Sequence, residues 1–519
     1  MHIPSRHSAP EQSPATSHFN LSSAERNILS WANNKRSFTT DQAAKHITRK
    51  GHKFHDLNRD GKVVVSFNFA GGFNAAQKAC ARQALKYWED VANIKFVEGG
   101  SNTDGTISIR GIGGTSGVAG LPNQHYNKVE ARIGTSGAHN PTMNSHFLGL
   151  LIHELGHTLG LSHPGGYNGS GTYSRSAEYA QDTKARSVMS YWSETYQPGH
   201  NFAGQSPVAP MMDDIAAAQQ LYGANTNTRN TDTTYGFNSN TGRNFYSLKH
   251  GSDKPIFTVW DGGGTDTLDF SGFTQNQTIN LKAETFSDVG GLRGNVSIAK
   301  GVSVENAIGG FGDDTLMGNE GNNRLTGGRG ADRLHGGAGA DTFVYQRVSD
   351  STPQNPDIIQ DFQSGIDKID LTGVLGAVGL KSLSFADQFS GSAGAAVLGR
   401  DPKTGRYTLA VDTTGNGTAD LLVVSQHPIK QTDVIWNNQS PAVIAPSDTT
   451  LTPVSVLPVA TVLPPDSDTA PNTHTDTDPD PDPGPGPGPE PLPWPGMGVI
   501  KKVASVFKRM LNGVFSIFR

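Results

Sequence analysis

Three histidines in the first third of the chain have the spacing needed to hold a catalytic metal ion. The run from His153 to His163 reads H-E-x-x-H-x-x-G-x-x-H, with Glu154, His157 and Gly160 at its fixed positions. On a helix, His153 and His157 project from the same face because they are four residues apart. Gly160 allows the chain to leave helical geometry, so that His163 can reach the same ion. Three imidazole nitrogens and one water predict an open tetrahedral zinc site, which is typical of hydrolases.

The chemistry that such a site predicts is hydrolysis by a metal-activated water. Zinc polarises a carbonyl group and lowers the pKa of its bound water towards neutrality. Glu154 can take the proton of that water and deliver it to the leaving amine. A pair of histidines four residues apart is by itself more often structural. The added glycine and third histidine favour the metal site.

A second motif downstream points to a family. Residues 187–192 read Ser-Val-Met-Ser-Tyr-Trp. With the histidine run, this motif resembles the metzincin clan of zinc endopeptidases, in which a turn carrying a methionine passes under the zinc-binding histidines. Met189 fits that position, although an isolated methionine is more often core filler. Tyr191 is similar to a tyrosine of the serralysin branch. The resemblance implies that Tyr191 is a weak extra zinc ligand that hydrogen-bonds the oxyanion during the reaction.

Other segments extend the resemblance to serralysins, with gaps, from about residue 30 to about 436. They are residues 210–225, 234–240 and 361–371. Asp213 and Asp214 lie in the first of these segments. We interpret one of them as an anchor of the zinc site or a cap of the next helix.

The hydrophobic patterns of residues 21–225 indicate an α/β domain, which we interpret as the protease domain. We expect strands over 63–69, 94–97, 106–110 and 129–133, and helices over 22–33, 74–92 and 145–160. In the resembling family, the strand before the zinc helix is an edge strand that pairs with the peptide substrate. Here that region is 117–122. It departs from the usual aromatic-rich pattern, so the side-chain preference of the cleft stays open.

Four consecutive nine-residue units follow at 309–317, 318–326, 327–335 and 336–344. They follow the pattern G-G-x-G-x-D-x-U-x of calcium-binding β-rolls. Calcium takes six to eight oxygen ligands, which stacked turns supply from their carbonyls and from the aspartate at position six. The apolar residue at position eight fills the thin core. A flexible glycine-rich linker is the alternative, but the strict period favours the roll.

Each turn is expected to share its ion with the turn two repeats later. This pairs Asp314 with Asp332, and Asn323 with Asp341. We expect the second pair to bind calcium more weakly, because Asn323 replaces an aspartate. The candidate calcium ligands of the repeats are Gly310, Gly312, Asp314, Gly328, Gly330, Asp332, Gly337, Gly339 and Asp341.

A partial repeat at 261–269 resembles a further calcium site of serralysins. Its candidate ligands are Asp261, Gly263 and Asp266, to which the resemblance adds Arg229, Asp232 and Glu305. Residues 412–417 have some likeness to an EF-hand loop, but they carry too few acids and we interpret them as a hairpin turn. Residues 226–436 are therefore predicted to form an all-β domain, a parallel β-roll with a β-rich end.

The composition excludes several classes of protein. A net charge of −5 and a pI of about 6.4 argue against a nucleic-acid-binding protein. The one cysteine, Cys80, excludes a disulfide within the chain, and its place in a predicted helix suits a small buried hydrophobe. Residues 1–15 contain no apolar signal sequence, and no apolar run reaches the length of about 18 residues that spans a membrane. We therefore expect that the protein either stays inside the cell or is exported by a route that uses a C-terminal signal.

The C-terminal end departs from the resembling family, whose members end soon after a segment like 433–436. Residues 437–496 are rich in Pro, Thr and Asp, which predicts a disordered, extended linker. Residues 497–519 form a basic amphipathic pattern without acids, which predicts a helix. A secretion signal, contact with a membrane surface or partner, and docking on the protein itself all remain open for this helix.

The patterns together favour a secreted, extracellular zinc endopeptidase with a calcium-stabilised β-roll. We expect one catalytic Zn²⁺, several structural Ca²⁺, protein or peptide substrates, type I export machinery as a partner and a monomeric state. Residues 1–20 are a candidate propeptide. The alternatives are a catalytically silent calcium-dependent binding protein and a membrane-active toxin that uses the C-terminal helix.

Overall fold

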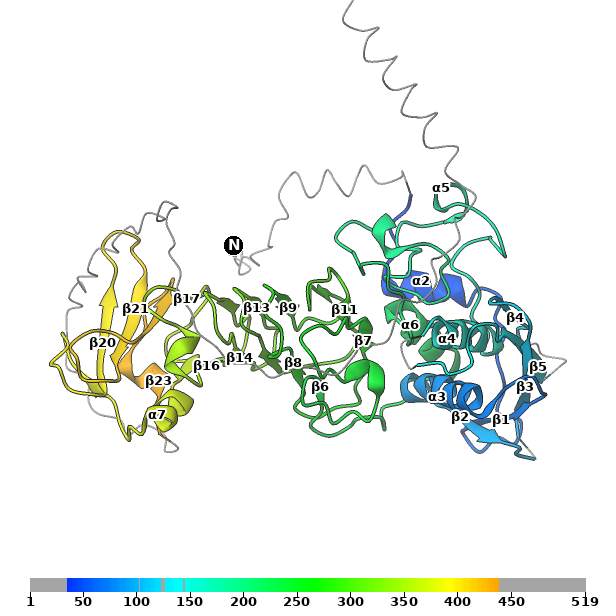
Figure 1. Ribbon diagram of the computed structural model, residues 1–519, viewed down its shortest axis with the longest axis horizontal. Coiled ribbons are helices and arrows are strands. Elements are labelled where there is room, and N and C mark those ends of the chain that lie inside the picture. The colour runs from blue at the N-terminus through cyan, green and yellow to red at the C-terminus, as the bar shows by residue number, and fades with distance from the viewer. Residues whose placement is uncertain (1–34, 102, 123–126, 143–144, 438–519) are drawn as a thin grey trace, which may run out of the picture. The chain divides into compact units, whose positions relative to one another are not determined.

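The computed structural model describes residues 35–101, 103–122, 127–142 and 145–437 (Figure 1). The candidate propeptide, the predicted helix over 22–33, the linker beyond residue 437 and the C-terminal helix lie outside these residues. Within the described part of the chain, no helix is both long and apolar enough to cross a membrane.

A five-stranded sheet forms the first part of the described chain, and its strand order is β2-β1-β3-β5-β4. Its strands are β1 (Val63–Phe69), β2 (Ile94–Glu98), β3 (Gly105–Ile112), β4 (Gly117–Ala119) and β5 (Lys128–Gly134). All neighbours are parallel except β4, which pairs antiparallel with β5 and leaves its other edge free. The four predicted strands and the expected edge strand are thus confirmed.

Two long helices pack with this sheet (Figure 1). They are α3 (Ala75–Val91) and α4 (His146–Thr158), and each begins at a capping side chain, Asn74 and Ser145 respectively. The buried indole of Trp88 joins them by donating from Nε1 to the carbonyl of Ile152 at 3.2 Å. Cys80 is buried on α3, as predicted. The other helices of this part are α2 (Thr40–Ile47), α5 (Tyr173–Ser176), η1 (Glu194–Tyr196) and α6 (Met212–Tyr222).

Short strands then stack into two mainly parallel sheets. The seven-stranded sheet has the order β23-β18-β16-β14-β12-β8-β6, and the eight-stranded sheet has the order β19-β20-β21-β22-β17-β15-β13-β9. The predicted repeats supply β13 (Thr315–Met317), β14 (Arg324–Thr326), β15 (Arg333–His335) and β16 (Thr342–Val344). Each pairs in parallel with the strand two repeats away. The apolar residues at position eight, Leu316, Leu325, Leu334 and Phe343, are fully buried between the sheets.

The remaining strands flank these repeats. Before them lie β6 (Thr234–Gly236), β7 (Phe257–Val259), β8 (Thr267–Asp269), β9 (Thr278–Asn280), β10 (Phe286–Ser287), β11 (Val296–Ile298) and β12 (Asn306–Ile308). After them lie β17 (Asp357–Ile359), β18 (Lys368–Asp370), β19 (Ser384–Phe385), β20 (Ala395–Arg400), β21 (Tyr407–Asp412), β22 (Leu421–Ser425) and β23 (Val434–Ile435).

The end of this β-rich part differs from the predicted all-β, parallel arrangement. One helix, α7 (Thr372–Val378), follows β18, and β20, β21 and β22 pair antiparallel. The loop after β21 confirms the predicted hairpin turn. There the Asp412 carboxylate accepts the backbone N–H groups of Gly415 and Gly417 at 2.6 and 2.8 Å. The nine-residue period ends before residue 346, so it could not predict these elements.

Candidate metal centre

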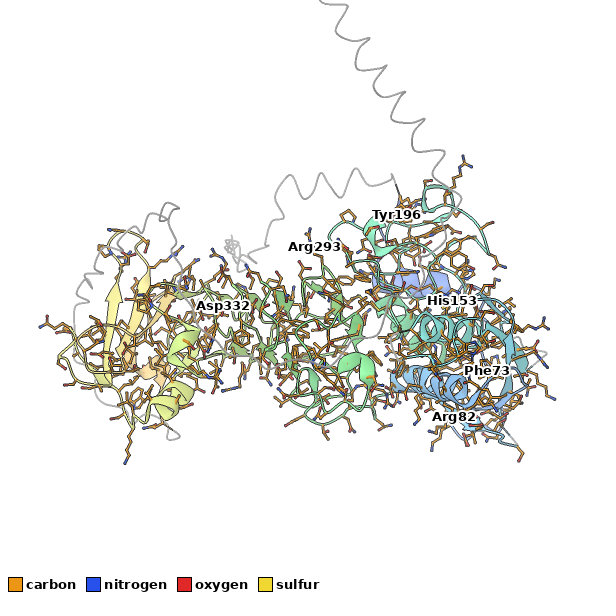
Figure 2. All side chains as sticks on the ribbon, viewed as in Figure 1. Phe73, Arg82, His153, Tyr196, Arg293 and Asp332 are labelled. Atoms are coloured by element: carbon orange, nitrogen blue, oxygen red, sulfur yellow. The ribbon has the colours of Figure 1, made fainter. Side chains whose placement is uncertain are left out.

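Helix α4 and the turn after it bring the three predicted histidines together. His153 and His157 lie one helical turn apart on α4, and Figure 2 labels His153 there. Gly160 follows with φ of +106°, and a Cβ at this position would lie 1.9 Å from the carbonyl oxygen of His52. A side chain is excluded both by the backbone conformation and by the close approach. The chain turns at this glycine and returns with His163.

The Nε2 atoms of the three histidines converge on one point. The Nε2 atom of His163 lies 3.2 Å from that of His153 and 3.1 Å from that of His157. The Nδ1 atoms face the backbone carbonyls of Val188, Leu161 and Tyr167 at 2.8, 2.7 and 2.9 Å. Because a carbonyl only accepts, each Nδ1 carries the proton and each Nε2 presents a lone pair.

This donor set fits a zinc ion. Three lone pairs at such separations repel one another unless a cation lies between them. Zinc held tetrahedrally at about 2.0–2.1 Å from each nitrogen would set them about 3.3 Å apart, close to the observed spacing. Burial lowers the pKa of His153 and lowers that of His157 well below its usual value, and it brings the pKa of His163 down to about 4. The imidazoles are therefore neutral near pH 7, which is the form that binds a metal.

Glu154 lies beside the triad with one carboxylate oxygen unused. Its side chain is buried, and Oε2 has no hydrogen-bond partner among the described residues. Burial raises the pKa of Glu154 to about 7. A Cβ on Gly117 of the edge strand would lie 2.7 Å from the Glu154 side chain, so this glycine leaves the room that the carboxylate occupies. An unpaired carboxylate oxygen at this position can accept a proton from a water molecule.

Tyr191 lies next to the triad, as predicted. Its ring centroid is 4.5 Å from that of His163 and 5.9 Å from that of His153. The hydroxyl accepts the backbone N–H of Gly169 at 3.3 Å. This single long hydrogen bond is the hydroxyl's partner in the described chain, and it leaves the proton of the hydroxyl available for another acceptor.

Two further residues hold this side of the site, and the sequence motifs did not predict them. Tyr167 stacks on His163 with centroids 5.2 Å apart and planes at 18°. Its hydroxyl donates to Asp182 at 2.8 Å, and Ser190 donates to the same Asp182 oxygen at 2.7 Å. Asp182 is fully buried and therefore ties the third histidine to the turn that carries Tyr191. No repeat or ligand spacing marks either residue in the sequence.

The predicted methionine turn lies under the histidines. Met189 is fully buried, and a Cβ on Gly156 of α4 would lie 2.7 Å from its sulfur. The Asp214 carboxylate accepts the backbone N–H of Val188 at 2.7 Å and that of Met211 at 2.9 Å. Asp214 thus performs both functions that the sequence left open, since it anchors the turn and caps α6. Asp213 instead pairs with Arg186 at 3.2 Å.

The triad opens into a cleft of about 850 Å³. Its walls come from β4, α4, the methionine turn and segment 204–208. The lining residues are Thr115, Ser116, Gly117, Ser145, His146, Gly149, Leu150, His153, Glu154, Gly169, Lys184, Val188, Ser190, Tyr191, Gly204, Gln205, Ser206, Pro207 and Val208.

The repeats bring the candidate calcium ligands together in the expected pairs. The backbone N–H of Asp314 donates to Oδ1 of Asp332 at 2.8 Å, and that of Asn323 donates to Oδ1 of Asp341 at 2.8 Å. The glycines of one turn face the carbonyls of the turn two repeats earlier. A Cβ on Gly328 or Gly330 would lie 2.2 Å from the oxygen of Gly310 or Gly312, and a Cβ on Gly337 or Gly339 would lie 2.2 or 2.6 Å from that of Asn319 or Gly321.

One buried carboxylate oxygen in the repeats has no protein partner. Oδ2 of Asp332 is buried without a hydrogen bond among the described residues (Figure 2 labels this residue). A buried, unpaired carboxylate oxygen is costly and fits a bound cation. The same holds for Oδ2 of Asp266 in the partial repeat.

The partial repeat also collects its predicted residues. Asp261 accepts from Gly263 N at 2.6 Å, Asp232 accepts from Thr265 N at 2.9 Å, and Glu305 accepts from Asp266 N at 2.8 Å. Arg229 joins them only through its carbonyl oxygen, which faces Gly262 N at 3.3 Å. Its guanidinium points away and pairs with Asp90 of α3 at 3.0 Å.

The aspartate ladder, in which the carboxylate of one turn accepts a backbone N–H of an earlier turn, continues beyond the four repeats. Asp332 N donates to Asp357 at 2.9 Å, Gly336 N to Asp361 at 2.9 Å and Asp341 N to Asp367 at 3.0 Å. Counting nine-residue units missed these three aspartates, because residues 346–356 break the period. Each accepts a backbone N–H in its carboxylate, as Asp332 and Asp341 do within the repeats.

Comparison with known proteins gives the family. The family model described as "Peptidase M10 serralysin C terminal" matches residues 224–436. The chain is 47% identical over 444 residues to metalloprotease AprA of Pseudomonas entomophila, which covers 78% of this chain and 91% of the relative. It is 43% identical to serralysin C of Dickeya chrysanthemi, and the match covers 77% of this chain and 90% of that relative. It is 44% identical to serralysin of Proteus mirabilis, and that match covers 73% of this chain and 88% of the relative. On this identity and coverage, with a histidine triad able to hold a metal, the chain belongs to the serralysin family of metalloproteases.

Proposed function

We propose that this metalloprotease is a secreted zinc endopeptidase that cleaves proteins, with Glu154 as the base that accepts a proton from the attacking water. The observation that carries the proposal is the convergence of three neutral Nε2 atoms beside the unpaired Oε2 of Glu154. His153, His157 and His163 would hold the ion. When bound, zinc supplies a Lewis acid that polarises the scissile carbonyl and lowers the pKa of water.

Glu154, Tyr191 and strand β4 supply the other roles that the reaction needs. Glu154 accepts a proton from water and returns it to the leaving amine. Tyr191, whose hydroxyl accepts from Gly169 N and keeps its own proton free, would donate a hydrogen bond to the oxygen that gains charge. The free edge of β4 suits pairing with an extended peptide, because its outer N–H and C=O groups have no strand beside them.

We infer that residues 21–225 form the protease domain and residues 226–436 the calcium-binding β-roll. The family match at 224–436 and the start of the short strands at Thr234 support this division. Ca²⁺ bound between Asp314 and Asp332, and beside Asp266, would neutralise buried carboxylates. The ions would stabilise the roll, since they bind only its folded form.

Export by a type I system fits a chain whose C-terminal residues 497–519 are basic and amphipathic. Residues 437–496 would separate this signal from the roll. Deleting 497–519 should abolish export while the purified protein keeps its protease activity. Undiminished export of the truncated protein would show that the signal lies elsewhere.

The experiment that tests the proposed activity is Glu154→Gln. This change keeps the size of the side chain and removes the base, so cleavage of a denatured protein should fall by at least about 10²-fold. Zinc content, measured by atomic absorption, should remain one ion per chain. Lys86→Gln on the exposed face of α3 is the matched control and should cleave normally. Retained cleavage by Glu154→Gln would contradict the assigned role.

A further inference from the structure

Lys184 brings a positive charge into the cleft that holds the histidine triad. Of the described residues that line the cleft, Lys184 is the only lysine or arginine, and Glu154 is the only carboxylate. Lys184 lies two residues after Asp182, and its backbone N–H donates to the carbonyl of Trp192 at 2.9 Å. This hydrogen bond holds the backbone of Lys184 against the turn that carries Tyr191.

The ammonium group of Lys184 has few hydrogen-bond or ion-pair partners among the described residues. Nζ donates to Ser206 Oγ at 3.4 Å, and no described carboxylate oxygen lies within 4.0 Å of it. The charge of Glu194 acts on it, but the two oxygens of Glu194 already accept from Ser193 Oγ and Phe202 N, each at 2.9 Å. Burial lowers the pKa of Lys184, which is the expected effect when a half-buried cation lacks a partner.

The charge of Lys184 also reaches the metal ligands. Burial is the main cause of the lowered pKa of His153, and the Lys184 ammonium adds to it. Lys184 and His153 line the same cleft, together with Val188 and Ser190 of the methionine turn. A side chain flanking the scissile bond can therefore reach Lys184 while the scissile carbonyl lies at the triad.

We propose that Lys184 determines substrate specificity by binding the carboxylate of an Asp or Glu side chain within two residues of the cleaved bond. The proposal rests on the proposed endopeptidase activity. A substrate carboxylate would supply the partner that the cleft lacks, and a charge-assisted hydrogen bond in a partly dehydrated site is stronger than one in water. Ser206, on segment 204–208, lies beside the ammonium group and would add a further hydrogen bond to the carboxylate.

The test is cleavage-site profiling of a peptide mixture by mass spectrometry with wild type, Lys184→Gln and Lys184→Glu. Wild type should show enrichment of acidic residues at one position within two residues of the cut. Lys184→Gln should lose that enrichment, and Lys184→Glu should replace it with Lys or Arg. Lys86→Gln, which removes an exposed lysine on α3, should keep the wild-type profile.

A matched peptide pair keeps the test decisive if a variant folds poorly. Wild type should cleave a peptide with Glu at the identified position about tenfold faster, in kcat/KM, than its Gln counterpart. Lys184→Gln should treat the two peptides alike. Cleavage without acidic enrichment would overturn the role of Lys184 and leave the protease activity intact, whereas no cleavage by wild type would refute the activity itself.

Discussion

The carbonyl oxygen of Val188 lies 2.8 Å from Nδ1 of His153 and sets the orientation of that imidazole. Val188 is in turn held by Asp214, which accepts its N–H at 2.7 Å. Asp214 is fully buried and also accepts the hydroxyl of Ser187 at 2.6 Å. One carboxylate, which has no ion pair among the described residues, therefore determines where a metal ligand points.

Asp214→Ala should weaken zinc binding and destabilise the protease part of the chain. The change leaves buried donors of Val188, Met211 and Ser187 without acceptors, which should cost about 3 kcal/mol or more. Zinc affinity should fall about 10- to 100-fold, as for other residues that orient metal ligands. Competition with a chromogenic chelator and chemical unfolding would measure both effects. Unchanged affinity in a folded variant would remove Asp214 from the metal site.

Tyr191→Phe should lower kcat with little change in KM. The hydroxyl contacts Gly169 N at 3.3 Å in the resting site, so its loss removes a donor needed only when charge develops on the substrate oxygen. We expect a drop of about 10²-fold in kcat, measured on a fluorogenic peptide at saturating zinc. Equal losses in kcat for Tyr191→Phe and for the exposed control Tyr196→Phe would count against a specific role.

The carboxyl of Asp182 should make stability depend on pH. Burial raises the pKa of Asp182 to about 6, above its value of about 3.9 in an unfolded chain. The folded state then binds the proton more tightly. Its contribution to stability is complete below about pH 4 and is lost as the pH rises to about 6, by up to about 3 kcal/mol.

Asp182→Asn removes this titration and leaves every histidine in place. The difference in unfolding free energy between wild type and Asp182→Asn, taken from urea titrations at pH 4 to 7, should therefore shift in favour of the variant as the pH rises. A difference that stays constant across this range would show that Asp182 is ionised in the folded protein throughout.

Asn323→Asp should strengthen calcium binding between the second and fourth repeats. Asn323 Nδ2 now donates to the carbonyl of Glu305 at 3.0 Å, and its N–H donates to Asp341. A second carboxylate facing Asp341 adds charge to the site, and charge count raises affinity for calcium. Isothermal titration calorimetry should detect one class of sites about tenfold tighter. Asn322→Asp, on the exposed side of the same turn, is the control.

Asp90→Asn should loosen the attachment of the protease part to the roll. Asp90 accepts from Arg229 at 3.0 Å and from Arg243 at 2.7 Å, and it is buried. Neutralising it leaves two guanidinium groups without their partner and should cost about 3 kcal/mol. Calorimetry should then resolve two unfolding transitions in place of one. A single transition at the wild-type temperature would contradict the bridging role.

The sequence predicted the parts of this protein that follow a fixed spacing. The histidine run, the methionine turn and the nine-residue repeats each have a period or a motif, and each is where the spacing puts it. Tyr167 and Asp182 could not be predicted, because they reach the site from a loop whose path depends on the packing of Trp192 and Tyr173. The motif also could not predict where the guanidinium of Arg229 lies, since only the carbonyl oxygen of this residue follows the family pattern.

The aspartate ladder has a direction along the chain. Asp314 is capped by Asp332, and Asp332 and Asp341 are capped by Asp357 and Asp367, so every turn depends on a residue that is synthesised after it. A nascent chain that ends at residue 345 lacks Asp357 and Asp367, which accept the backbone N–H groups of its last two turns. The ribosome therefore delivers these acceptors last, and the final two turns gain their hydrogen bonds only after residue 367 has been made.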